Sequence, residues 1–125
     1  MISSAFVLLV HGLVLLFAPE FLFIVFDVSV SSGGFVTAQL FSAALIGLGL
    51  MNWTARGVVL GGIYGRALVY GNFAHAFVGF FIGLRARLVG FANGYFWTEI
   101  ALYLAFTIAF GVMLFRGPLS KPAES

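Results

Sequence analysis

The sequence predicts an all-α integral membrane protein, a four-helix bundle with both chain ends in the cytoplasm. Its composition is 62% hydrophobic and 8% charged, whereas soluble domains are about 45–50% apolar and about 25% charged. Its apolar residues form long continuous runs, which favour helices over the short alternating strands of a membrane barrel. A bilayer core about 30 Å thick takes about 20 helical residues per crossing. The 125 residues are therefore enough for about four crossings in a single bundle.

The first predicted span covers about residues 3–26 and is kinked or interrupted near Pro19. The opening run MISSAFVLLVHGLVLLF has no basic residue before it and no small-x-small cleavage site after it, so we expect it to be retained rather than removed as a signal peptide. Apolar character resumes after Pro19 as FLFIVF. Two structures fit this pattern: a helix kinked at the proline, or a short span followed by a segment lying at the membrane interface.

Three plainer spans follow, at residues 35–54, 67–84 and 97–115. Arginines close to their ends, and a glycine and a proline after the last span, indicate where these helices stop. We expect residues 1–117 to form the single bundle and residues 118–125 to be a short disordered tail. The sequence shows no internal repeat and no second domain.

The few charged and polar groups set the predicted orientation. One membrane face would carry Arg56, Arg66, Arg116 and Lys121, and the other only Arg85 and Arg87. The positive-inside rule therefore places both chain ends in the cytoplasm. The net charge of +2 comes from only six basic residues, which argues against nucleic-acid binding. The absence of cysteine excludes disulfides and thiolate metal sites.

Residues spaced four apart predict which helix faces pack together. The third span has the row Gly71, His75, Gly79 and Gly83, and the second span has the row Gln39, Ala43, Gly47 and Met51. Small residues at this spacing let a neighbouring backbone approach closely. The fourth span has the polar row Glu99, Tyr103, Thr107 and Gly111. We expect each row to face the bundle interior, because lipid would penalise its polar members.

The chain has two histidines, and both are predicted at the same depth. His11 and His75 each lie about eight residues into a span, so at about 1.5 Å per residue both would be about 12 Å from the same membrane face. With Asn72 and Thr107 they form a predicted interhelical polar site. Three roles fit it: hydrogen bonds between helices, axial ligation of a b-type haem, or a relay for protons or ions.

Two further clusters are predicted at the membrane faces. The cytoplasmic cluster flanks a glycine-rich turn and would hold a lipid headgroup or another anion with forked arginine donors; its members are Asn52, Arg56 and Arg66. The outer cluster would join the last two helices through an ion pair from Glu99 to one of two arginines; its members are Gln39, Arg85, Arg87 and Glu99. The alternative for the cytoplasmic arginines is that they only fix the topology, and the outer cluster is predicted to be structural rather than catalytic.

Enzyme and exchanger classes find little support in the sequence. It has no Gly-x-Ser-x-Gly nucleophile elbow and no grouping of carboxylates and histidines that would make a metal site. A small drug–proton exchanger would need a carboxylate deep in a span, and the sequence places none at mid-depth. We therefore expect a non-enzymatic protein.

The stretches GLGLMNWTARG and GGIYGRALVYGNFAHAFVGF resemble a set of small four-helix bacterial inner-membrane proteins that are broadly DoxX-like. The likeness covers most of the second and third spans and includes Asn52, Trp53, Arg56, Gly61, Gly62, Tyr64, Arg66, Gly71, Asn72 and His75. This resemblance implies the fold and a location in the bacterial inner membrane. It brings no reaction with it.

The expected function is that of an accessory or structural subunit, packed against copies of itself or against other subunits of a larger membrane complex. Rows of small residues, 16 phenylalanines and little mass outside the membrane favour this function. Phenylalanine-rich faces also suit a bound lipid, quinone or pigment. One alternative is a small oligomeric transporter or channel with a polar route near His11 and His75. A third is a bis-histidine haem protein.

Overall fold

The computed structural model describes residues 1–57 and 63–116, which fold into helices joined by short turns. No strand occurs in these two ranges, so the all-α prediction is confirmed. The predicted disorder of residues 118–125 lies outside the described residues. The elements in chain order are α1 (Ile2–Phe17), α2 (Pro19–Phe26), α3 (Ser32–Thr54), η1 (Ala55–Gly57), α4 (Ile63–Leu88), η2 (Gly94–Phe96) and α5 (Trp97–Arg116).

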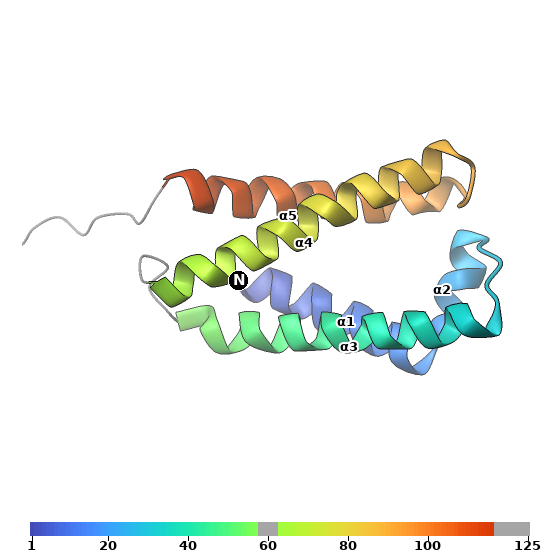
Figure 1. The fold of residues 1–125 in the computed structure, drawn as a ribbon, viewed down its shortest axis with the longest axis horizontal. Helices are drawn as coiled ribbons and strands as arrows, with labels where there is room; N and C mark the ends of the chain where they lie inside the picture. Colours follow the sequence, from blue (N-terminus) through green and yellow to red (C-terminus); the bar gives the residue numbers. More distant parts are fainter. Residues whose placement is uncertain (58–62, 117–125) are drawn as a thin grey trace, which may run out of the picture.

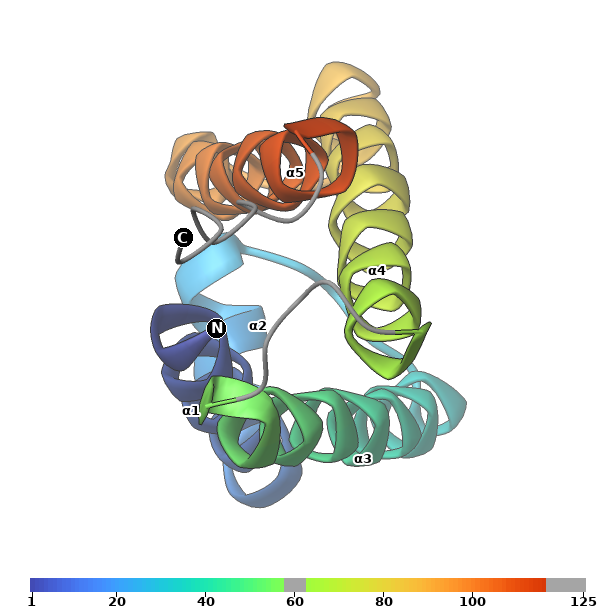
Figure 2. The same ribbon diagram turned by 90° about the vertical axis from the view of Figure 1, so that its left-hand side faces the viewer.

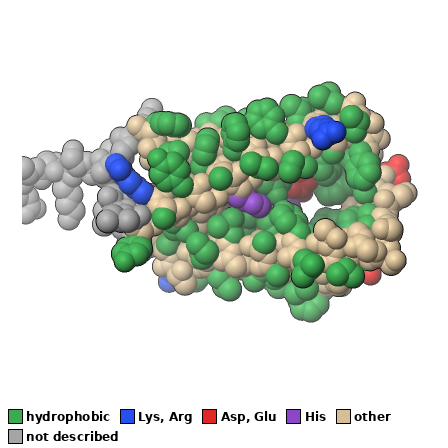
Figure 3. Space-filling model, viewed as in Figure 1, with side chains coloured by type: hydrophobic (Ala, Val, Ile, Leu, Met, Phe, Trp, Pro, Cys, Tyr) green, Lys and Arg blue, Asp and Glu red, His purple; other side chains and the backbone are tan. Residues whose placement is uncertain are grey.

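Within residues 1–57 and 63–116, three helical segments are long and apolar enough to cross a membrane. They are Ser32–Gly57, Tyr64–Leu88 and Gly94–Phe115, with mean hydropathies of 1.7, 1.5 and 1.9. Helices α1 and α2 together supply a fourth crossing if the bent pair is one span. Hydrophobic side chains cover much of the face seen in Figure 3, as expected for helices that face lipid. These features agree with an integral membrane protein.

The first predicted span is broken at Ala18. Helix α2 turns away from α1 by 100°, far more than a continuous helix bends at a proline. Pro19 is the first residue of α2, where its missing N–H costs nothing because that position has no partner within the helix. Asp27 ends α2 in the left-handed conformation, with φ of 56°. As a result, α2 lies across one end of the molecule (Figure 1).

The four long helices form two antiparallel pairs, α1 with α3 and α4 with α5 (Figures 1 and 2). Most tertiary contacts lie within these pairs rather than between them. The start of α1, the end of α3, the start of α4 and the end of α5 lie at one end of the molecule. Helix α2 and the turn between α4 and α5 lie at the other end.

Glycines bring the backbones together in the first pair. A Cβ added at Gly12 of α1 would stand 2.7 Å from the Ile46 side chain and 3.1 Å from the carbonyl oxygen of Ser42. Gly49 of α3 lies in the same way against Leu9, at 2.8 Å. Close approach through small residues is the usual basis of helix packing in membranes. The sequence analysis missed both glycines.

Three of the four residues in the predicted row of α4 face the interior, since His75 lines the space between the helix pairs. Gly79 lies directly against the ring of Tyr103, and Gly83 packs on Ile100 of α5. Gly71 meets nothing within 4 Å and is exposed. A row of residues four apart turns slowly around a straight helix, so its two ends face different neighbours.

The predicted row of α3 is on the wrong face. All four of its members are exposed, namely Gln39, Ala43, Gly47 and Met51. The buried face of α3 consists of Ser42, Leu45, Gly49 and Asn52. A repeat in the sequence shows which residues share a face, but it does not show which face meets α1.

The turn between α4 and α5 is tied to α2. The backbone N–H of Asn93 donates to the Phe26 carbonyl oxygen at 3.0 Å, and its side-chain amide donates to the Val25 carbonyl oxygen at 2.8 Å. The rings of Phe26 and Phe96 meet edge to face with centroids 5.1 Å apart. These contacts close one end of the space between the two helix pairs.

Candidate functional site

A cavity of about 230 Å³ lies between the two helix pairs. Residues from all five α-helices line it, and the turn between α4 and α5 covers its end with α2. It is larger than the cavity of about 150 Å³ that holds benzene in an engineered protein core. Most of its lining is apolar, with five phenylalanines: Phe26, Phe41, Phe96, Phe106 and Phe110. Figure 3 shows a histidine at the seam between the pairs and a hollow further along.

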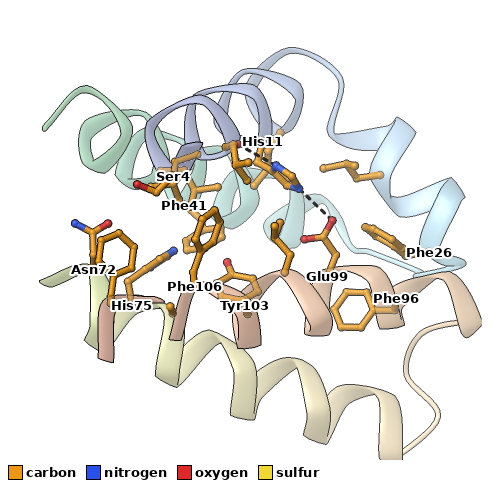
Figure 4. A pocket seen from close by; sticks show the side chains of 18 residues that line it. Ser4, His11, Phe26, Phe41, Asn72, His75, Phe96, Glu99, Tyr103 and Phe106 are labelled. Atoms are coloured by element: carbon orange, nitrogen blue, oxygen red, sulfur yellow. Dashed lines mark hydrogen bonds and ion pairs between the residues drawn. The ribbon is translucent and has the colours of Figure 1, made fainter. Parts of the chain in front are cut away.

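An ionisable pair crosses this cavity from α1 to α5. His11 Nε2 lies 3.1 Å from Glu99 Oε1, as Figure 4 shows. The other ring nitrogen, Nδ1, lies 3.0 Å from the carbonyl oxygen of Val7. The side chains of His11 and Glu99 are 32% and 19% exposed, so both are largely withdrawn from the surface.

The geometry fixes how many protons this pair holds. The Val7 carbonyl can only accept, so His11 Nδ1 must carry a hydrogen. The contact from Nε2 to Glu99 needs a second hydrogen, which belongs either to a charged imidazolium or to a neutral carboxylic acid. In both cases the pair shares one proton between these atoms and has no net charge.

The ring of His75 lies between two aromatic rings on the cavity wall. Its centroid is 6.2 Å from that of Phe41, nearly parallel, and 5.7 Å from that of Tyr103. His75 Nε2 is buried and has no hydrogen-bond partner among the described residues. The Tyr103 hydroxyl also points into the cavity (Figure 4). Buried polar atoms are normally paired, so His75 Nε2 marks where a bound molecule would place a polar group, and the Tyr103 hydroxyl faces the same space.

A buried amide network joins the two helix pairs near the start of α1. The side chains of Asn52 and Asn72 exchange two hydrogen bonds of 2.7 Å. Asn52 also donates to the Ser4 hydroxyl at 3.1 Å, and Asn72 donates to the Leu68 carbonyl at 2.9 Å. All three side chains are at most 2% exposed. Asn52 was predicted to bind a headgroup; that is wrong, because it is enclosed by α1, α3 and α4.

The predicted outer cluster does not assemble. Glu99 pairs with His11 rather than with Arg85 or Arg87, because it lies one turn into α5 and faces α1. The Arg87 guanidinium instead lies 5.8 Å from the ring centroid of Trp97. The Gln39 amide donates to the Leu16 carbonyl at 3.4 Å. The ion pair predicted between the last two helices is therefore wrong.

The two arginines predicted to face the cytoplasm are exposed at the end where α3 stops and α4 starts. Arg56 lies 4.6 Å from the ring centroid of Trp53 and donates to its carbonyl oxygen at 2.8 Å. Arg66 is exposed in the first turns of α4. Binding of a lipid headgroup or another anion by these two side chains stays a prediction.

The predicted histidine site is only partly brought together. Both histidines and Asn72 line the cavity, but Thr107 donates to the Tyr103 carbonyl of its own helix at 2.8 Å and does not join them. His11 has no free ring nitrogen for iron in this arrangement, so a haem would require it to leave Glu99. The bis-histidine haem and the polar transport route stay predictions.

Ser4 and the partnership of His11 with Glu99 were not predicted from the sequence. The spacing of Ser4, Leu8, His11 and Leu15, at four, three and four residues, indicates the face of α1 that lines the cavity, but it does not pair His11 with Glu99. Comparison of the chain with protein-family models, curated proteins and solved structures found no match.

Proposed function

We propose that this chain is a non-enzymatic integral membrane protein that binds an apolar molecule between its two helix pairs. The proposal includes four crossings, both ends in the cytoplasm and a bacterial inner membrane, as the distribution of arginines and the DoxX-like resemblance predict. A lipid, a quinone or a pigment are candidate ligands, as the phenylalanine content predicts.

The cavity is the observation that carries this proposal. A mostly apolar space with a few converging polar groups is the usual form of a small-molecule site. One of its polar groups, His75 Nε2, is buried without a partner among the described residues, and the Tyr103 hydroxyl points into the cavity. The seam between the helix pairs runs along the side of the molecule, so an apolar molecule can enter the cavity directly from the bilayer.

Filling the cavity should displace the bound molecule. Leu102 lines the cavity. The larger side chain of Leu102→Trp should overlap the bound molecule and lower the protein's affinity for it by about tenfold or more, because a loss of about 1.4 kcal/mol of binding free energy is a factor of ten. The measurement is native mass spectrometry of protein extracted in a mild detergent, together with lipid analysis and an absorption spectrum. The spectrum distinguishes a pigment or haem from a colourless ligand.

Leu104→Trp is the matched control. Leu104 lies on the same helix, is 40% exposed and is not part of the cavity lining, so this variant should keep the ligand. Equal occupancy in the two tryptophan variants, or a native protein with no co-purified molecule, would count against the proposal.

We also propose that the exposed face of α3 packs against a helix of another membrane chain, as expected for an accessory subunit. Gly47 on this face meets nothing within 4 Å, and its neighbours Ala43 and Met51 are exposed. Small residues on a membrane helix favour close approach of a second helix. In this protein the face is not used by any described helix.

Gly47→Leu should disrupt the packing of α3 against the second chain. The added side chain would hold a second helix away, so the particle extracted in mild detergent should shrink to the mass of the single chain. Ala105→Leu, on an exposed position of α5, should leave the mass unchanged. A native particle that already has the mass of one chain would rule out this second proposal and leave the first one untouched.

A further inference from the structure

We infer that the cavity takes an organic cation, a substituted ammonium or similar lipophilic cation whose charge lies against Glu99. This inference rests on the proposed function, since it names the class of molecule bound in the same cavity. It does not require any residue outside the cavity lining.

The first support is the charge of the lining. Among the described residues that line the cavity, Glu99 is the only carboxylate and none is a lysine or an arginine. The other titratable groups there are His11 from α1, His75 from α4 and Tyr103 from α5, whereas α2 and α3 contribute only apolar side chains. A carboxylate whose neighbouring bases are only histidines can pair with a cation once it gives up the proton that it shares with His11.

The second support is the free side of the carboxylate. Only Oε1 of Glu99 contacts His11, and the second oxygen is turned toward the cavity (Figure 4). A carboxylate oxygen can accept further hydrogen bonds or contact a cation while the first oxygen keeps its partner. A ligand can therefore reach Glu99 through the oxygen that does not contact His11.

The third support is the aromatic wall around this carboxylate. Phe26 and Phe96 meet edge to face on one side of it, and Tyr103 and Phe106 lie on its other side (Figure 4). Aromatic faces attract cations, and the attraction increases when water is excluded. An aromatic cage with one carboxylate suits a cation with apolar substituents better than it suits an anion or a sugar.

Binding of a cation must displace a proton. Without a ligand, the pair of His11 and Glu99 shares one proton and is neutral, and a net charge is costly in a largely enclosed apolar site. When a cation pairs with the ionised Glu99, neutrality is restored if the shared proton passes to the solvent, which leaves His11 as a neutral imidazole protonated at Nδ1 and Glu99 as a carboxylate. One positive charge therefore enters as one proton departs, and no bond other than the N–H or O–H bond is broken.

A pair of probes that differ only in charge tests the inference. Benzyltrimethylammonium and neopentylbenzene have the same shape, with nitrogen in one replaced by carbon in the other. We expect the cation to bind the protein in zwitterionic nanodiscs at least about tenfold more tightly, as for a hydrogen-bonded or paired charge. Equal or tighter binding of the neutral probe would overturn the inference and leave the proposed function standing. Binding of neither probe would overturn both.

Two substitutions locate the charge that is recognised. Glu99→Gln keeps a hydrogen-bonding group next to His11 and should weaken binding of benzyltrimethylammonium by roughly ten- to a hundredfold, with little effect on neopentylbenzene. Glu20→Gln removes a carboxylate from the exposed face of α2 and should change neither affinity. Unchanged binding of the cation to Glu99→Gln would overturn the inference.

Proton release is a readout that needs no variant. Calorimetry in two buffers of different ionisation enthalpy should show about one proton released per cation bound. His75→Gln should still release about one proton, because the inference assigns it to the pair of His11 and Glu99. Zero release by the native protein, or loss of the release in His75→Gln, would overturn that assignment.

Discussion

Replacing Gly12 with alanine is expected to lower the free energy of unfolding by about 1–3 kcal/mol, the usual cost of overpacking a well-packed interface. The added Cβ would stand 3.1 Å from the Ile46 nitrogen and 3.1 Å from the Ser42 carbonyl oxygen. Both atoms belong to the backbone of α3, so they cannot rotate away as a side chain would. Helices α1 and α3 must therefore move apart along their length.

Gly47→Ala is the matched control for this effect. Gly47 also lies in a membrane-type helix, but a Cβ there meets nothing within 4 Å. Since alanine is favoured over glycine in helices by about 1 kcal/mol, this variant should be neutral or slightly more stable. Steric trapping or titration with a denaturing detergent would measure both variants. Equal stabilities for the two would show that the approach of α1 to α3 is not limited by Gly12.

Asn52→Ala is expected to lower the free energy of unfolding by about 1–2 kcal/mol. The substitution leaves the side-chain oxygen of Asn72 without its donor in a site that is 2% exposed. An unpaired buried polar group costs about 1–3 kcal/mol in soluble proteins, whereas single interhelical hydrogen bonds in membranes average about 0.6 kcal/mol. Because the two amides exchange two hydrogen bonds, we expect the loss of stability on substitution to lie between those values.

A double-mutant cycle with Asn72→Ala isolates the interaction between the two amides. We expect a coupling energy of at least about 0.5 kcal/mol, as for residues that share one hydrogen-bond network. Thr54→Ala is a control near the same end of α3, because the Thr54 hydroxyl is exposed and bonds only to its own helix. Additive effects of the two asparagine substitutions would contradict the role given to this network.

The sequence predicted where the helices lie more completely than which helices pack together. Apolar runs located α3, α4 and α5 within a few residues, because the length of a membrane helix follows from bilayer thickness. Pro19 marked the break after α1, since a proline is favoured at the start of a helix and disfavoured inside one. The angle of 100° between α1 and α2 could not be predicted, because α2 is held by hydrogen bonds to Asn93, which is distant from it in the sequence.

The site was predicted in its parts but not in its pairings. His11, His75 and Asn72 were expected inside the protein and do line the cavity. Glu99 was expected to meet an arginine because both are near the same turn in sequence. The Glu99 carboxylate instead faces α1, because the rotation of α5 about its own axis determines which helix this side chain meets. Helical periodicity fixes the relative directions of side chains on one helix but not the rotation of that helix against another.

The grouping of consecutive helices into pairs has a consequence for how the chain enters a membrane. Helices α1 to α3 follow one another in sequence, as do α4 and α5, so each half can be inserted as a complete hairpin before the halves meet. In that intermediate Asn52, Asn72 and Glu99 lack their partners from the other half and face lipid, which is costly. Relief of this cost would drive the second stage of assembly, in which the two hairpins dock around the polar groups that each exposes.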